Sequence, residues 1–175
     1  MDNSLERFFW NQIEDMNFNE RGYKGAGEYL VNKSTLTFKG MKEVRNFVFA
    51  KASELYNKFD KEFRGSDDGF SDVVYQVIAN GEEAFNNITI KELQSMYDEN
   101  RYTESFAYAF HIIDEMEDEE KDNALAKAEN RLEDIRRGYG GGFMTKLVAA
   151  FDHADGGNKR KLAKGFPELF GPLVD

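Results

Sequence analysis

No proline occurs before Pro167 in this chain of 175 residues, and the only other proline is Pro172. Proline removes a backbone donor and disrupts a helix interior, so its absence leaves long helices free to form along nearly the whole chain. Hydrophobic residues make up 41% of the sequence and aromatic residues 14%, which is enough to bury a core. The chain is therefore expected to fold, with helix as its dominant structure.

The clearest predicted helix begins near Gly40. Its apolar residues recur every three or four positions and would line one face, which must be buried against other helices: Met41, Val44, Val48, Ala52, Leu55, Phe59 and Phe63. Similar spacing predicts helices near 4–15, 67–79, 89–100, 106–113, 125–138 and 143–155. The predicted fold class is mainly α, a compact helical bundle-like domain, with helix exceeding half of all residues.

Two segments interrupt this pattern. The stretch 28–38 is rich in residues that favour strands, which leaves open one short β-hairpin there. Before it, Gly22, Gly25 and Gly27 follow one another closely, which predicts a flexible connector.

A glycine cluster at 138–142 is the best candidate for a hinge. It divides the chain into a main helical domain, 1–137, and a C-terminal helical segment, 138–175. The second either folds beside the first or packs on the same core.

Charge is unevenly distributed along the chain. Residues 61–135 hold 20 acidic and 7 basic side chains, whereas residues 136–175 hold 4 acidic and 7 basic ones. Six of the seven residues from Asp114 to Glu120 are carboxylates. An acidic middle argues against direct nucleic-acid binding, because phosphate contacts supply most of that affinity. It fits a basic protein partner, mimicry of DNA, or a solvated face that only maintains solubility.

The sequence has few residues of the types that usually act in catalysis or bind metals. Cysteine is absent, which removes disulfides and zinc–thiolate sites, and the only histidines are His111 and His153. His111 with Asp114 and Glu115 has metal-ligand spacing, but the helical pattern predicts that this histidine faces solvent. No catalytic residue, cofactor or metal site is predicted.

Two short motifs mimic binding loops. Arg136 and Arg137 precede the glycine cluster as in a phosphate cradle, but the Gly-Lys-Ser/Thr ending of a P-loop is missing. Asp152, Asp155 and Asn158 suggest a calcium loop, but the glutamate expected at its twelfth position is missing. A linker is the preferred interpretation of the first motif.

The segment Ser66-Asp67-Asp68-Gly69-Phe70, followed by Gly81-Glu82-Glu83, resembles an uncharacterised bacterial family of unknown function. Residues 142–169, which end in Lys-Gly-Phe-Pro-Glu-Leu, are similar to the endings of small phage and mobile-element proteins. The resemblance implies a bacterial or phage accessory protein and assigns no active residue.

These observations favour a non-catalytic protein-interaction or regulatory module. The alternatives are an anti-defence or DNA-mimic inhibitor that uses 114–122, and an enzyme or small-ligand binder whose site the sequence does not reveal. The expected partner is another protein, either basic or itself nucleic-acid-binding, with no membrane; the oligomeric state is open. No apolar run reaches the length of a bilayer span, which predicts a cytoplasmic protein. The candidate partner-binding residues are Asp114, Glu115, Glu117, Asp118, Glu119, Glu120, Asp122, Phe166, Leu169 and Phe170.

Overall fold

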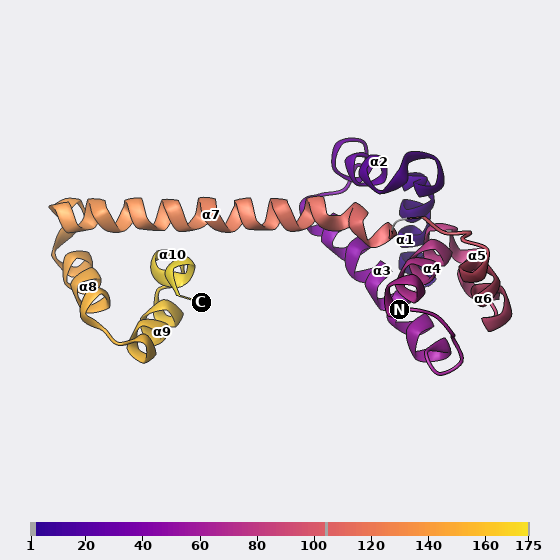
Figure 1. The fold of residues 1–175 in the computed structure, drawn as a ribbon. Coiled ribbons are helices and arrows are strands. Elements are labelled where there is room, and N and C mark those ends of the chain that lie inside the picture. The colour runs from indigo at the N-terminus through magenta and orange to yellow at the C-terminus, as the bar shows by residue number, and fades with distance from the viewer. Residues whose placement is uncertain (1–2, 104, 175) are drawn as a thin grey trace. The chain divides into compact units, whose positions relative to one another are not determined.

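The computed structural model describes residues 3–103 and 105–174, and it is 84% helical. Within these residues there are ten α-helices and no strand (Figure 1). The mainly α fold class is confirmed. The chain divides into two compact units, Met1–Asp114 (unit 1) and Glu115–Asp175 (unit 2).

Unit 1 packs its helices around one large core. The elements are α1 (Asn3–Met16), α2 (Phe18–Asn32), α3 (Phe38–Phe59), α4 (Asp67–Ala79), α5 (Glu82–Asn87), α6 (Ile90–Asp98), the 3₁₀ turn η1 (Phe106–Phe110) and the start of α7 (His111–Asp134). The predicted stripe on α3 lies in this core: Val48, Leu55 and Phe59 are all buried. That prediction is confirmed.

Side-chain caps set two of the helix starts. The Ser66 hydroxyl accepts a hydrogen bond from the Gly69 amide at 3.1 Å and begins α4. The Thr89 hydroxyl accepts one from the Glu92 amide at 3.3 Å and begins α6. Each bond satisfies an amide that the first turn leaves without a partner.

The β-hairpin left open at 28–38 does not form. Residues 28–32 complete α2, and the amides of Lys33 and Ser34 both donate to the Tyr29 carbonyl, at 2.9 and 3.0 Å. Thr37 then caps α3 by accepting from the Gly40 amide at 3.2 Å. The polar residues of this stretch therefore end one helix and begin the next.

The glycines at 22–28 are not a flexible connector. Gly22 makes a kink within α2 at φ 65°, and Gly27 is buried in the same helix. A Cβ added at Gly27 would lie 2.6 Å from the backbone carbonyl oxygen of Ala109. Glycine is needed here because α2 and η1 approach each other backbone to backbone.

Gly27→Ala is expected to lower the free energy of unfolding of unit 1 by about 1–3 kcal/mol, because the backbone of η1 must move to admit a methyl group. Trp10 is the only tryptophan and is buried in unit 1, so its fluorescence during urea unfolding measures this loss. Gly40→Ala is the control: an added Cβ there lies 3.3 Å from the flexible end of Leu36, with its next contacts at 3.5 and 3.6 Å. Alanine also favours helix by up to about 1 kcal/mol. Equal effects of the two substitutions would contradict the close approach.

Unit 2 comprises the rest of α7, a π-helical turn η2 (Ile135–Tyr139), α8 (Gly141–His153), α9 (Gly156–Gly165), α10 (Pro167–Phe170) and the 3₁₀ turn η3 (Gly171–Leu173). Its small core consists of Leu132, Ile135, Val148, Phe151, Leu169 and Phe170. Phe151 and Phe170 stack with ring centroids 4.2 Å apart.

The prediction of separate helices before and after the acidic stretch is wrong, because α7 is continuous from His111 to Asp134. No glycine or proline interrupts these 24 residues, and alanine, glutamate, lysine and leucine all favour helix. The acidic stretch is therefore displayed on a regular helix.

The glycine cluster at 138–142 forms a turn in which Gly138 and Gly141 take positive φ values of 98° and 72°. Residues on both sides of the cluster, Ile135 and Val148 among them, share the core of unit 2. The hinge and the division at 137/138 stay predictions.

Candidate protein-interaction site

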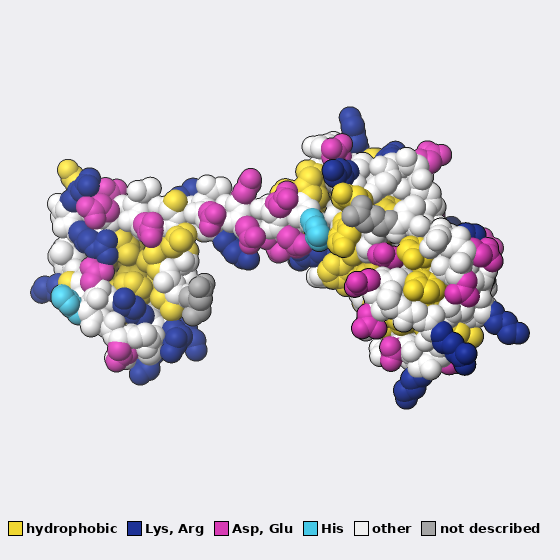
Figure 2. All heavy atoms as spheres, viewed as in Figure 1, with side chains coloured by type: hydrophobic (Ala, Val, Ile, Leu, Met, Phe, Trp, Pro, Cys, Tyr) yellow, Lys and Arg dark blue, Asp and Glu magenta, His cyan; other side chains and the backbone are white. Residues whose placement is uncertain are grey.

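The acidic segment, Asp114–Asp122, lies on α7 with most of its side chains in solvent. Glu115, Asp118, Glu119, Glu120 and Asp122 are exposed, and Glu117 is half-buried. Figure 2 shows Asp and Glu side chains along this helix.

Only part of this charge is neutralised by ion pairs. Asp114 pairs with Arg45 of α3, and Asp118 lies 3.3 Å from the Lys121 ammonium. Within the described residues, no ion pair is formed by Glu115, Glu119, Glu120 or Asp122.

The segment also places like charges one turn apart. Glu115 faces Glu119 and Asp118 faces Asp122 at i, i+4 spacing, and each such pair destabilises a helix by about 0.2–0.5 kcal/mol. The segment is therefore a concentrated, exposed source of negative potential.

The apolar candidates of the C-terminal tail do not form one exposed surface, because two of the three are buried. This corrects the prediction for those two residues. Leu169 and Phe170 are 3% and 0% exposed and belong to the core of unit 2. Phe166 remains 37% exposed. The small unit has few other large side chains to bury, so α10 supplies two of its six core residues.

Two exposed aromatic residues were missed by the sequence analysis. Tyr139 is 82% exposed in the glycine turn, and Phe143 is 68% exposed in the first turn of α8. Phe143 has helical spacing to Leu147 and Phe151, but the buried face of α8 is formed by Val148 and Phe151 with Leu147 beside them. Nothing in the sequence distinguishes the two faces of so short a helix.

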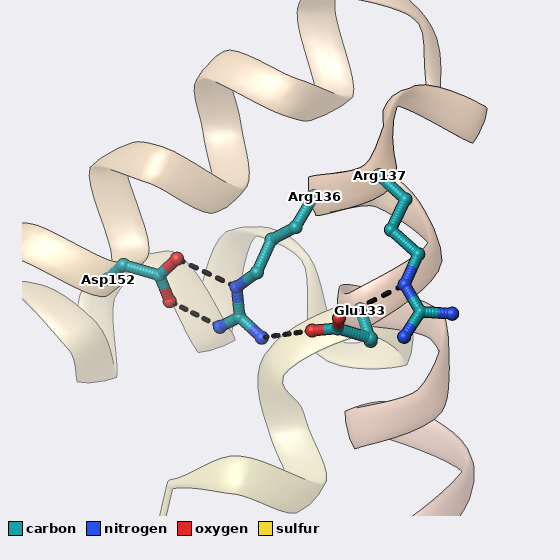
Figure 3. Close-up of polar contacts among 4 residues, drawn as sticks. All are labelled: Glu133, Arg136, Arg137 and Asp152. Carbon is teal, nitrogen blue, oxygen red and sulfur yellow. Dashed lines mark hydrogen bonds and ion pairs between the residues drawn. The ribbon is translucent and has the colours of Figure 1, made fainter.

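The two arginines before the glycine cluster are used within unit 2 (Figure 3). Arg136 donates two hydrogen bonds to the Asp152 carboxylate, at 2.6 and 3.0 Å, and lies 3.8 Å from Glu133. Arg137 donates to the other side of Glu133 at 3.1 Å. These bonds join the end of α7 to α8. Both guanidinium groups bind carboxylates of unit 2, so they do not form a phosphate cradle.

The calcium-loop residues have structural roles as well. Asp155 caps α9 by accepting from the Asn158 amide at 2.8 Å, and Asp152 is held by Arg136. Hydrogen bonding to Arg136 lowers the pKa of the Asp152 carboxyl below its usual 3.8.

Asp152→Asn is expected to lower stability by less than about 1 kcal/mol, because the pair is bidentate but exposed to water. A depressed carboxyl pKa stabilises the folded state above the unfolded pKa, and this contribution is lost as pH falls through the folded pKa. The difference between wild type and variant should therefore be present at neutral pH and vanish well below pH 3.8. Urea unfolding followed by circular dichroism at both pH values measures it; a difference that grows in acid would contradict the assignment.

His111 is exposed, as predicted, and its ring lies 5.0 Å from that of Tyr108. The described residues contain no group of three or more metal-ligating side chains. In the same part of the chain, no helix has the length and apolar character needed to cross a membrane.

The chain has no matching protein family, curated protein or solved structure. Its site must therefore be interpreted from its own geometry.

Proposed function

We propose that this protein is a non-catalytic interaction module that binds a basic protein partner through the acidic segment. The observation that supports this proposal is the set of four exposed carboxylates on α7 that form no ion pair within the described residues. Their mutual repulsion lowers the stability of the helix, and a cationic partner would relieve it.

A rigid helix is well suited to this role. The segment lies on a helix that continues in both directions, so its charges are fixed in position before a partner arrives. Long-range attraction acts before contact and accelerates association, so the charge is expected to affect the on-rate most.

The test replaces Glu115, Asp118, Glu119 and Asp122 by the corresponding amides and measures binding of a labelled oligoarginine peptide by fluorescence anisotropy. We expect the affinity to fall by about tenfold or more, through slower association, as the charge pairs are lost. The helical spectrum should be unchanged, and the melting temperature should hold or rise slightly as repulsion falls.

The matched control removes four exposed carboxylates elsewhere: Glu28→Gln, Asp60→Asn, Glu62→Gln and Glu83→Gln. It changes the net charge equally, so it should weaken binding much less if the acidic segment is the recognition surface. Equal losses in the two variants would refute this assignment and leave the segment as a solvated face.

Mimicry of DNA is the second candidate, and the linear charge density favours it. The acidic segment carries seven carboxylates in nine residues. At the rise of an α-helix this is one negative charge per about 1.9 Å, close to the ~1.7 Å of duplex DNA. A mimic would displace a labelled duplex from a bacterial histone-like protein and lose this ability steeply as salt rises. A module for other basic proteins would leave the duplex bound.

We further propose a bacterial or phage accessory role in the cytoplasm. The resemblances of the Ser66–Phe70 motif and of residues 142–169 support this origin. Fractionation of a bacterial host that expresses the tagged chain tests the location.

A further inference from the structure

Unit 2 separates its charges by position. Residues 115–134 hold nine acidic and three basic side chains, whereas residues 136–166 hold two acidic and seven basic ones. The visible face of unit 2 in Figure 2 shows Asp and Glu along α7, and Lys and Arg around α8 and α9. The unit is therefore negative along α7 and positive at the other end of its chain.

The carboxylates of the positive end are used internally. Asp152 binds Arg136 and Asp155 caps α9, as described above. Lys146, Arg160 and Lys164 form no ion pair within the described residues and are exposed. These three cations are thus available to an external anion.

Exposed aromatic side chains lie among these cations. Phe143 and Phe166 form a ring pair with centroids 6.4 Å apart, and Tyr139 is the most exposed large hydrophobic residue described. Lys146 follows Phe143 by one helical turn, and Lys164 precedes Phe166 by two residues. We call Tyr139, Phe143, Lys146, Arg160, Lys164 and Phe166 the basic–aromatic end.

The acidic residues within 115–134 of α7, which are opposite in charge to the basic–aromatic end, lie on the same unit. Glu115 precedes Ile135 by 20 residues of helix, so the acidic residues begin about 30 Å from the glycine turn. An antiparallel pair related by a twofold axis would set the acidic residues of each copy against the basic–aromatic end of the other. Leu125, which is exposed on α7, offers apolar contact to the aromatic rings.

We propose that the basic–aromatic end binds a second copy of this chain, on the residues 115–125 of its α7, and so forms a twofold dimer. The proposal rests on the acidic segment being a recognition surface and names its partner. A nucleic acid or an anionic membrane fits less well, because the net negative charge of 115–134 repels a polyanion from the same unit.

Sedimentation velocity of the full chain tests the dimer. We expect a dimer in roughly 0.1 M salt that dissociates in roughly 1 M salt, where the screening length falls from about 10 Å to about 3 Å. Phe143→Ala should raise the dimer dissociation constant by about tenfold, while circular dichroism and melting show an intact fold.

A charge exchange makes the test specific. One variant carries Lys146→Glu, Arg160→Glu and Lys164→Glu; the other carries Glu115→Lys, Glu119→Lys and Asp122→Lys. Each alone should be monomeric because it places like charges opposite each other, and an equimolar mixture should form the heterodimer.

A wild type that is monomeric in roughly 0.1 M salt, or a mixture that stays monomeric, would overturn the dimer. Binding of an oligothymidine strand or of phosphatidylglycerol vesicles by monomeric protein, lost in the Lys→Glu variant, would assign the surface to that ligand instead. A monomer that still binds oligoarginine through 115–122 would overturn the dimer and leave the proposed function standing. Equal oligoarginine binding by the amide variant and its control would remove the proposed function itself.

Discussion

Phe170→Ala is expected to lower the free energy of unfolding of unit 2 by about 3–5 kcal/mol, the cost of truncating a buried phenylalanine. Phe170 is 0% exposed and stacks on Phe151, in a core of only six buried residues. In urea unfolding followed by far-ultraviolet circular dichroism, the helix signal that comes from unit 2 should be lost at a lower urea concentration than in the wild type. Trp10 lies in unit 1, so its fluorescence transition should not move.

Phe166→Ala is the matched control, because Phe166 comes from the same tail and remains partly exposed. It should cost less than about 1 kcal/mol. A similar cost for the two truncations, or a shift of the Trp10 transition by Phe170→Ala, would contradict the assignment of Phe170 to a separate core.

Phe59→Ala should destabilise unit 1 by a similar amount, about 3–5 kcal/mol. Phe59 closes the apolar stripe of α3 and is 5% exposed. Its removal leaves a cavity at the end of the longest helix of the unit 1 core. Here the Trp10 fluorescence transition should move to lower denaturant, in contrast to the Phe170 variant.

Phe49→Ala is its control on the same helix, since this ring is 41% exposed and forms T-shaped pairs with Tyr75 and Phe110 at centroid distances of 6.1 Å. We expect a loss near 1 kcal/mol. If Phe59→Ala cost less than about 1 kcal/mol, the predicted stripe would not be the buried face of α3.

Helix spacing predicted unit 1 well because its helices are long and their apolar faces are wide. α3 repeats its pattern over six turns, and a face of that length has only one way to be buried. The caps at Ser66 and Thr89 are equally local, since each depends on residues three positions apart.

The errors arose where distant contacts decide the structure. Gly27 is fixed by the backbone of η1, more than 80 residues later, and the local sequence resembles a flexible connector. The break expected within α7 does not occur because charge repulsion alone is too weak to end a helix of good helix formers.

The candidate site was predicted in its acidic half, and in its aromatic half only at Phe166. Exposure of the carboxylates follows from their charge, which costs too much to bury. Whether an aromatic residue is buried depends on which face the partner helices cover, so the exposure of Phe143 and the burial of Phe170 did not follow from the sequence.

The acidic helix has a practical consequence for dissecting the molecule. The buried residues of the first core end at Ile113, and those of the second begin at Leu132. Between Ile113 and Arg131, which directly precedes Leu132, Lys121 and Lys127 are the only trypsin sites, and both are exposed. Cleavage at one of these lysines, once the helix opens locally, cuts the chain between the two hydrophobic cores and leaves each core on one fragment. Limited digestion should therefore release two fragments that each retain their buried residues, and protection of these two lysines would report directly whether a partner covers the helix.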